Sequence, residues 1–263
     1  MKPRISFALL ASALALLALV SAPAPAFAAF HLMQIDQVIG GVAGDTTAQA
    51  VQLRMRTTGQ YVLSGDAQLV VRDGNGANPV TLSTFPMPNP ASTSPTCTAI
   101  LLTTSNFAAK TSPAAAANYT MTAIPASYLA AGTLTFETLG GATTYWRLSW
   151  GGFDPNDVMS SVAKGFNDDD GTTFPSVAAA LPSTTAQALA FTPPCGTTST
   201  TNASQYAKTG AAAVFTNEAG ATFTVQAPPS VPGLPGRSHW LLPALLCVGV
   251  LGFAVARRAR GIS

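Results

Sequence analysis

The chain has 263 residues, enough for one sizeable domain with terminal segments or for two small domains. Charged residues make up only 9% of it and hydrophobic residues 48%, which disfavours the charge-rich kind of intrinsic disorder. Between residues 29 and 238, eight basic residues stand against eleven acidic ones, a net charge of −3 with no basic stripe, so we expect no binding to nucleic acid.

Residues 1–28 have the pattern of a secretory signal peptide. Two basic residues precede an apolar stretch at residues 5–20, and Ala26-Phe27-Ala28 then supplies the small residues of a cleavage site. We therefore expect cleavage between Ala28 and Ala29. An uncleaved membrane anchor is the alternative, and the two prolines before the cleavage site disfavour it.

The body of the chain alternates apolar and polar residues with a period of two, which predicts strands. In residues 49–56 the apolar side chains face one way and Gln52, Arg54 and Arg56 the other, as in a half-buried strand. The sequence Asp73-Gly74-Asn75-Gly76 is typical of a tight turn. Further strands are expected at residues 67–72, 79–85, 98–103 and 221–226.

The clearest predicted hairpin joins residues 133–138 and 143–150 through Gly140-Gly141. Alternation places Trp146 and Trp150 on one face of the second strand, where core packing is the better interpretation than stacking on a sugar ring. Short helical turns are expected in two other segments, at residues 112–117 and 177–190. Residues 151–205 are the least regular part, for which we expect long loops.

Seven or more short strands separated by turns predict a mainly β fold, an antiparallel immunoglobulin-like β-sandwich over residues 29–226. A linker rich in proline and glycine follows at residues 227–239 and is expected to be extended.

Residues 240–256 form a run of 17 residues without charge, which at about 1.5 Å per residue spans roughly 25 Å, enough for a transmembrane helix. The basic tail at residues 257–263 contains Arg257, Arg258 and Arg260, which should remain in the cytoplasm. Residues 29–238 would then lie outside. A buried amphipathic helix is the alternative, and the apolarity on all sides of the segment disfavours it.

The end of the chain resembles the sorting tails of the PEP-CTERM type, which combine a short motif, an apolar helix and terminal arginines. The resemblance covers residues 231–260, where Val231-Pro232-Gly233-Leu234-Pro235 stands in place of the Pro-Glu-Pro signature. It implies that a membrane sorting protease cuts near the motif, in which case the domain is cargo that is released or transferred. A permanent membrane anchor is the alternative.

The front half resembles the lamin-tail-like domains of exported bacterial proteins. The resemblance rests on Met33-Gln34-Ile35-Asp36-Gln37-Val38, Gln49-Ala50-Val51-Gln52-Leu53-Arg54 and Tyr61-Val62-Leu63-Ser64-Gly65, with Gln52 where the family has glutamate. It implies an immunoglobulin-like sandwich and carries over no catalytic residue. The body as a whole is similar to a group of exported proteobacterial proteins.

Cys97 and Cys195 are the only cysteines between the expected signal peptide and the expected membrane helix, in which Cys247 lies. An even number in an oxidising compartment favours a disulfide. Such a bond would close a loop of about 98 residues and stabilise the fold by roughly 4–5 kcal/mol at most. Two independent buried thiols are the alternative.

A concentration of acidic residues is the strongest metal candidate. Calcium prefers several carboxylate and carbonyl oxygens together, although the spacing here does not fit an EF-hand, and a solvated polar turn is the plainer interpretation. The residues of this candidate calcium loop are Asp154, Asp157, Asp168, Asp169 and Asp170.

Catalytic patterns are sparse. His31 is the only histidine well away from the expected membrane helix, and it lacks both a G-x-S-x-G context and a credible zinc ligand set. Glu137 and Asp154 are conceivable as a glycosidase pair, with no pattern that places them together. We therefore expect no enzyme and no cofactor other than the candidate calcium.

The leading hypothesis is an exported, membrane-anchored envelope protein for adhesion, matrix assembly or partner binding. Its domain would lie in the periplasm or, after processing, on the cell surface. The alternative is a calcium-dependent carbohydrate-binding or carbohydrate-acting domain. The expected partners are the membrane, a sorting protease, and a surface glycan or protein.

Overall fold

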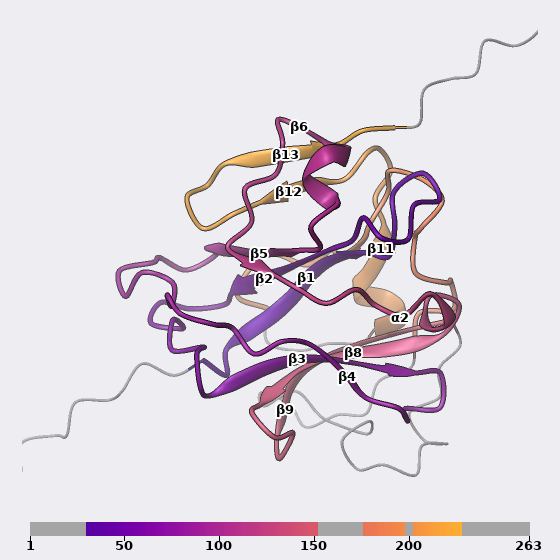
Figure 1. The fold of residues 1–263 in the computed structure, drawn as a ribbon. Helices are drawn as coiled ribbons and strands as arrows, with labels where there is room; N and C mark the ends of the chain where they lie inside the picture. The colour runs from indigo at the N-terminus through magenta and orange to yellow at the C-terminus, as the bar shows by residue number, and fades with distance from the viewer. Residues whose placement is uncertain (1–29, 152–175, 198–201, 228–263) are drawn as a thin grey trace, which may run out of the picture. The chain divides into compact units, whose positions relative to one another are not determined.

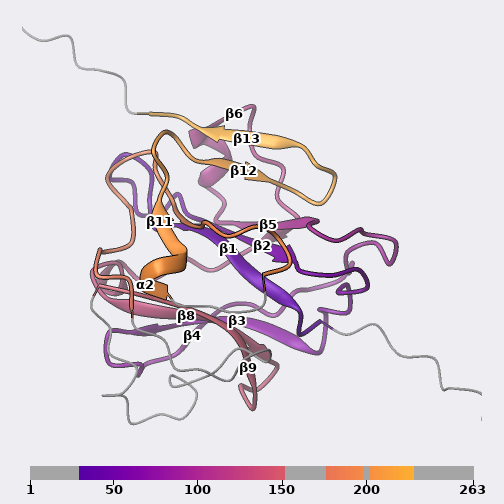
Figure 2. The ribbon, with the colours of Figure 1, turned by 180° about the vertical axis from the view of Figure 1, so that it is seen from behind.

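The computed structural model describes residues 30–151, 176–197 and 202–227, which fold as mainly β structure in three layers (Figures 1 and 2). The middle layer is a six-stranded sheet and the lower layer a four-stranded sheet, with a small three-stranded sheet above. The two larger sheets face each other as a sandwich, which confirms the predicted class. The segments expected to form the signal peptide and the C-terminal transmembrane helix lie outside the described residues.

The six-stranded sheet is mainly antiparallel, with one parallel pair, β5 and β7, which the sequence analysis did not predict. In spatial order its strands are β11 (Tyr206–Lys208), β10 (Leu189–Phe191), β1 (Met33–Ile39), β2 (Ala50–Met55), β5 (Ala99–Thr103) and β7 (Tyr119–Thr120).

The four-stranded sheet contains the predicted hairpin, whose two glycines both adopt positive φ, 86° at Gly140 and 76° at Gly141. The turn predicted after residue 72 is also present, with Gly76 at φ 71° and the Asp73 carboxylate accepting hydrogen bonds from the backbone. The strands, in order, are β4 (Val80–Ser83), β3 (Ala67–Asp73), β8 (Gly132–Thr138) and β9 (Thr144–Trp150).

The three-stranded sheet was not predicted as a separate layer. It consists of β12 (Val214–Thr216), β13 (Thr222–Val225) and β6 (Thr111–Ser112). The other described elements are short, namely the 3₁₀ turns η1 (Phe107–Lys110) and η2 (Ala126–Tyr128) and the helix α2 (Asn202–Gln205).

Two hydrophobic cores lie on opposite faces of the six-stranded sheet. The larger core fills the sandwich and includes Leu53, Phe136 and Trp146. The smaller core lies toward the three-stranded sheet and includes Leu101 and Phe215. Because adjacent residues of β5 alternate between the two cores, this strand is buried on both faces, as the burial of all five of its residues shows.

Some expectations for the irregular segments are wrong. Residues 112–117 contain no helical turn, because Ser112 pairs with β13 and Pro113 follows it. The described part of residues 177–190 is also not helical, since Val177 forms a bridge with Trp150 and Leu189 begins β10. The segment expected to form long loops therefore contains strand β10 and helix α2.

Candidate functional site

A polar cluster occupies the face of the six-stranded sheet that is turned toward β12. A β-bulge between Ile35 and Gln37 interrupts the register of β1 with β2 at Asp36. The Asp36 carboxylate then accepts hydrogen bonds from Arg54 Nη2 at 2.7 Å and from Gln52 Nε2 at 2.6 Å. The bulge thus brings side chains of two strands into one hydrogen-bonded group.

The same cluster joins the sheet to its neighbour. Gln52 Oε1 accepts a hydrogen bond from the backbone N–H of Thr216 at 2.6 Å, and Gln37 Nε2 donates to the carbonyl oxygen of Val214 at 2.7 Å. The polar side chains of residues 49–56 were expected on the outer face of a half-buried strand, but Gln52 and Arg56 are buried, at 1% and 5% exposure. That expectation is wrong for Gln52 because the third sheet covers the position.

The two charges of the cluster differ in exposure. The side chain of Asp36 is 8% exposed, whereas that of Arg54 is 33% exposed. Burial raises the pKa of the Asp36 carboxyl, and the Arg54 guanidinium and the Gln52 amide offset only part of this effect. Arg54 is therefore the member of the ion pair that a ligand can reach.

A cavity of about 410 Å³ opens at Arg54. Residues 95–99 before and within β5 line it, together with residues 216–220 in the turn between β12 and β13. Its volume falls within the range of small-ligand sites. The lining combines apolar atoms with polar residues, among them Arg54, Asn217 and three threonines, so it suits a ligand that accepts or donates hydrogen bonds beside apolar contacts.

Glu218 holds the walls of this cavity together. One carboxylate oxygen accepts hydrogen bonds from the Ala91 N–H at 2.5 Å and the Ser94 hydroxyl at 3.2 Å. The other accepts from Asn118 Nδ2 at 3.4 Å. The proline-rich segment before β5 is thereby tied to the turn between β12 and β13.

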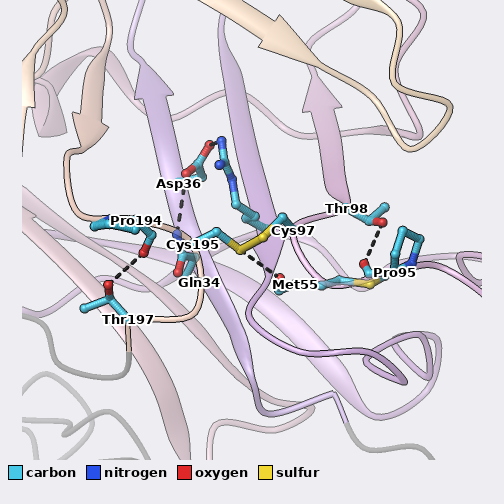
Figure 3. The surroundings of a disulfide bond; sticks show 10 residues. Gln34, Asp36, Met55, Pro95, Cys97, Thr98, Pro194, Cys195 and Thr197 are labelled. Atoms are coloured by element: carbon cyan, nitrogen blue, oxygen red, sulfur yellow. Dashed lines mark hydrogen bonds and ion pairs between the residues drawn. A yellow bond between two sulfur atoms is a disulfide. The ribbon is translucent and has the colours of Figure 1, made fainter.

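Cys97 lines this cavity and forms a disulfide with Cys195. Figure 3 shows the surroundings of the disulfide. The two Cα atoms are 5.8 Å apart, and the bond closes a sequence separation of 98 residues. The disulfide expected from the cysteine pattern is thus present in the structure.

Glu137 is placed for structure rather than for catalysis. It is completely buried on the four-stranded sheet, and Arg72 Nη1 and Nη2 contact its two oxygens at 3.1 and 3.2 Å. Thr135 and Gln68 donate two more hydrogen bonds to it. A carboxylate held in this way cannot meet a substrate, which argues against its use as a glycosidase acid.

The aromatic residues of β9 belong mainly to the core. Trp146 and Trp150 are fully buried, which confirms core packing for both and removes them as a sugar-stacking surface. Tyr145 packs against Phe30, with ring centroids 5.3 Å apart, and against His31 at 5.6 Å. His31 therefore contributes to an aromatic group next to the sandwich.

Several predicted site residues lie outside the described residues. They are the candidate calcium ligands Asp154, Asp157, Asp168, Asp169 and Asp170, the cleavage pair Ala28 and Ala29, and the tail residues Arg257, Arg258 and Arg260.

Within the described ranges, the structure groups no three histidine, cysteine or acidic residues in a way that could hold a metal ion. The same ranges include no helix with the length and apolarity needed to cross a bilayer.

Comparison with known proteins adds no relative. No protein-family model, curated protein or solved structure matches the chain.

The sequence analysis missed the cluster of Asp36 and Arg54 as a site, and it did not notice Glu218. Arg54 lies within a predicted strand and Asp36 within a segment noted only for its family resemblance, yet their contact depends on the bulge in β1. Glu218 lies in a turn with no pattern around it, and its partners are more than 90 residues away in sequence. The sequence offered one signal, namely an acidic residue in the segment that forms β1 and a basic residue in the segment that forms the adjacent strand β2.

Proposed function

We propose that this chain is an exported, membrane-anchored envelope protein that acts by binding a partner in adhesion or matrix assembly, and not by catalysis. The observation that carries the proposal is the Cys97–Cys195 disulfide. Disulfides form and persist in oxidising compartments, and the sequence at residues 1–28 independently predicts export to such a compartment.

The packing of the first described residues supports cleavage between Ala28 and Ala29. Phe30 lies edge-on to Phe136 and Tyr145, with ring centroids 6.3 and 5.3 Å away. Cleavage there would leave a short N-terminus directly before a residue that is part of the fold. The helix at residues 240–256 would then anchor the domain, with Arg257, Arg258 and Arg260 in the cytoplasm.

The proposal takes the fold as an immunoglobulin-like sandwich of the lamin-tail-like kind. Two of the three segments that resemble this family coincide with β1 and β2, adjacent strands in the middle of the six-stranded sheet. The cavity at Arg54 is the surface we assign to partner binding.

Export and anchoring are tested on the full chain in a bacterial host. Mass spectrometry of the membrane fraction should find a mature N-terminus at Ala29, and Cys97 and Cys195 should resist alkylation until reductant is added. Replacing Ala28→Asp should retain the leader, because signal peptidase requires a small residue there. Intact chain in the cytosol with free thiols would overturn the proposal.

The C-terminus and the ligand need separate measurements. Retention of Arg260 in the mature protein would establish a permanent anchor, and its loss would favour a sorting protease. For the ligand, the detergent-extracted chain is applied to a glycan array with calcium or with a chelator. Calcium-dependent glycan binding would replace this proposal with a carbohydrate-binding function.

A further inference from the structure

The disulfide lies where an external thiol can reach it. Cys97 is exposed and Cys195 is half-buried. Cys97 also lines the cavity that opens at Arg54, so a thiol can approach Cys97 through this cavity. Disulfides that are exposed or strained are the ones that exchange readily with thiols, in contrast to those enclosed in a core.

The backbone at Cys97 adds a second, independent feature. Its φ is 72°, in the left-handed region that L-residues other than glycine, asparagine and aspartate seldom adopt. The Cys97 N–H donates to the Met55 carbonyl at 2.8 Å, and the Met55 N–H donates to the Thr98 carbonyl at 2.9 Å. The surrounding structure therefore imposes this conformation on the cysteine.

Each of the two joined loops has hydrogen bonds of its own (Figure 3). The Thr98 hydroxyl donates to the Pro95 carbonyl at 2.8 Å, and the Thr197 hydroxyl donates to the Pro194 carbonyl at 2.7 Å. Behind the second loop, the Thr192 N–H donates to the Gln205 carbonyl at 2.8 Å. These bonds do not involve the sulfur atoms, so the turn in each loop and the pairing of Thr192 with Gln205 are independent of the disulfide.

We infer that the Cys97–Cys195 disulfide is a site of thiol–disulfide exchange, at which the protein forms a mixed disulfide with a thiol-bearing partner. The partner thiolate attacks Sγ of Cys97, forming a new sulfur–sulfur bond while the bond to Cys195 breaks. The electron pair of the broken bond leaves on Sγ of Cys195, which takes a proton from water. The number of disulfides is unchanged, so no oxidant or reductant is consumed.

The structure provides a position for the released sulfur. Sγ of Cys195 lies 3.5 Å from the carbonyl oxygen of Met55, a suitable acceptor for the new thiol. Cys195 therefore has an acceptor within reach in the position that it already occupies beside Cys97. Attack of its thiolate on Cys97 reverses the reaction and releases the partner, so the capture is covalent and reversible.

The inference does not depend on export and is tested on purified protein. The full chain carrying Cys247→Ser is incubated with reduced glutathione, quenched with acid and analysed by mass spectrometry, with near-ultraviolet circular dichroism as a measure of folding. A glutathione adduct on Cys97 should form while the circular dichroism spectrum stays native. Its rate of formation should be the same with and without urea at concentrations below the unfolding transition. A rate that rises with urea in step with unfolding, or no adduct before denaturation, would overturn the inference.

Two single-cysteine variants test which sulfur is attacked. In the Cys247→Ser background, Cys195→Ser leaves the exposed Cys97 thiol and Cys97→Ser leaves the half-buried Cys195 thiol. Maleimide should modify Cys97 in the Cys195→Ser variant at least roughly tenfold faster than Cys195 in the Cys97→Ser variant, because thiol reactivity follows accessibility and thiolate character. Equal rates, or a faster Cys195, would overturn attack at Cys97. A cysteine-bearing peptide in place of glutathione then distinguishes a protein partner from a small thiol.

Discussion

At the scale of single residues, two buried ion pairs among the described residues have different surroundings. Glu137 is completely enclosed and receives hydrogen bonds from Arg72, Thr135 and Gln68. In the other pair, the Asp36 carboxylate is buried but Arg54 reaches the cavity. A buried charge is costly to desolvate, and its partner offsets this cost only while the pair is intact. The first pair should therefore govern stability, and the second pair is the one that responds to solvent and ligand.

The variant Glu137→Leu should lower the free energy of unfolding by about 3–5 kcal/mol, because it leaves the Arg72 guanidinium buried without its counter-charge. The double variant Arg72→Met with Glu137→Leu should recover most of this loss, because it removes both charges. Urea denaturation measures both effects as a shift of the midpoint at constant slope. A double variant no more stable than Glu137→Leu alone would contradict a dominant role for the ion pair.

Asp36 and Asp45 should give opposite dependences of stability on pH. Burial raises the pKa of Asp36, so its ionisation costs stability as the pH rises from 3.8 through the raised folded value. Hydrogen bonds from Thr47 and Lys110 lower the pKa of Asp45 to about 2, so its contribution is present above pH 3.8 and is lost as the pH falls toward 2.

Unfolding in urea across pH tests this for the wild type against Asp36→Asn and Asp45→Asn. The free energy of unfolding of the wild type relative to Asp36→Asn should fall as the pH rises. Relative to Asp45→Asn it should fall as the pH is lowered. The same slope for both variants would show that the surroundings of Asp36 do not disfavour its charge.

At the scale of elements, long regular strands could be predicted from the sequence and short ones could not. The hairpin of β8 and β9 has seven residues per strand and two turn glycines, so period and turn chemistry agree. In contrast, β6 and β7 have two residues each, too few to show any period. Their pairing depends on contacts with β13 and β5, which only the folded chain brings together.

The candidate site illustrates the same limit. The base at residue 54 lies in a strand that the sequence predicts and the acid at residue 36 in a segment of the family resemblance, but the bulge that aligns them is a property of the paired sheet. The alanine-rich segment after Ser112 is a comparable case, because local propensity favours a helix there and pairing with β13 prevents it.

Glycines at the ends of β9 and in its hairpin should differ in their tolerance of alanine. Gly151 has a φ of 73°, and a Cβ there would overlap the backbone of Ala130 and Ala131. Gly140 has a φ of 86° with open space around it. Gly140→Ala should therefore lower the free energy of unfolding by about 1–2 kcal/mol, which is the cost of holding an alanine in the left-handed region.

Gly151→Ala should cost distinctly more, because strand β9 or the segment before β8 must shift to make room. Thermal melting of the two variants side by side provides the comparison. A melting temperature for Gly151→Ala equal to that of Gly140→Ala would contradict the close approach at this strand end.

At the scale of the whole molecule, the six-stranded sheet is common to both cores, so the three layers depend on one another. Contacts that cross the sandwich should then affect overall stability more than contacts within a surface loop. Tyr206 on β11 is such a contact, since it lies fully between the sheets and bonds to both of them. Burial raises the pKa of its phenol well above the ordinary value, so the hydroxyl keeps its proton and can donate.

Tyr206→Phe should lower the free energy of unfolding by about 2–4 kcal/mol, because it leaves two buried polar groups without this partner. The hydroxyl accepts a hydrogen bond from Trp146 Nε1 at 2.7 Å and donates one to the carbonyl oxygen of Ile35. Tyr128→Phe is the matched control, since its hydroxyl bonds to the Asn78 carbonyl in an exposed position, where water can replace it. Urea denaturation should show a large shift for the first variant and almost none for the second. Equal small shifts would mean that the two large sheets are held together by apolar packing alone, and that the hydrogen bonds across the sandwich are not a source of its stability.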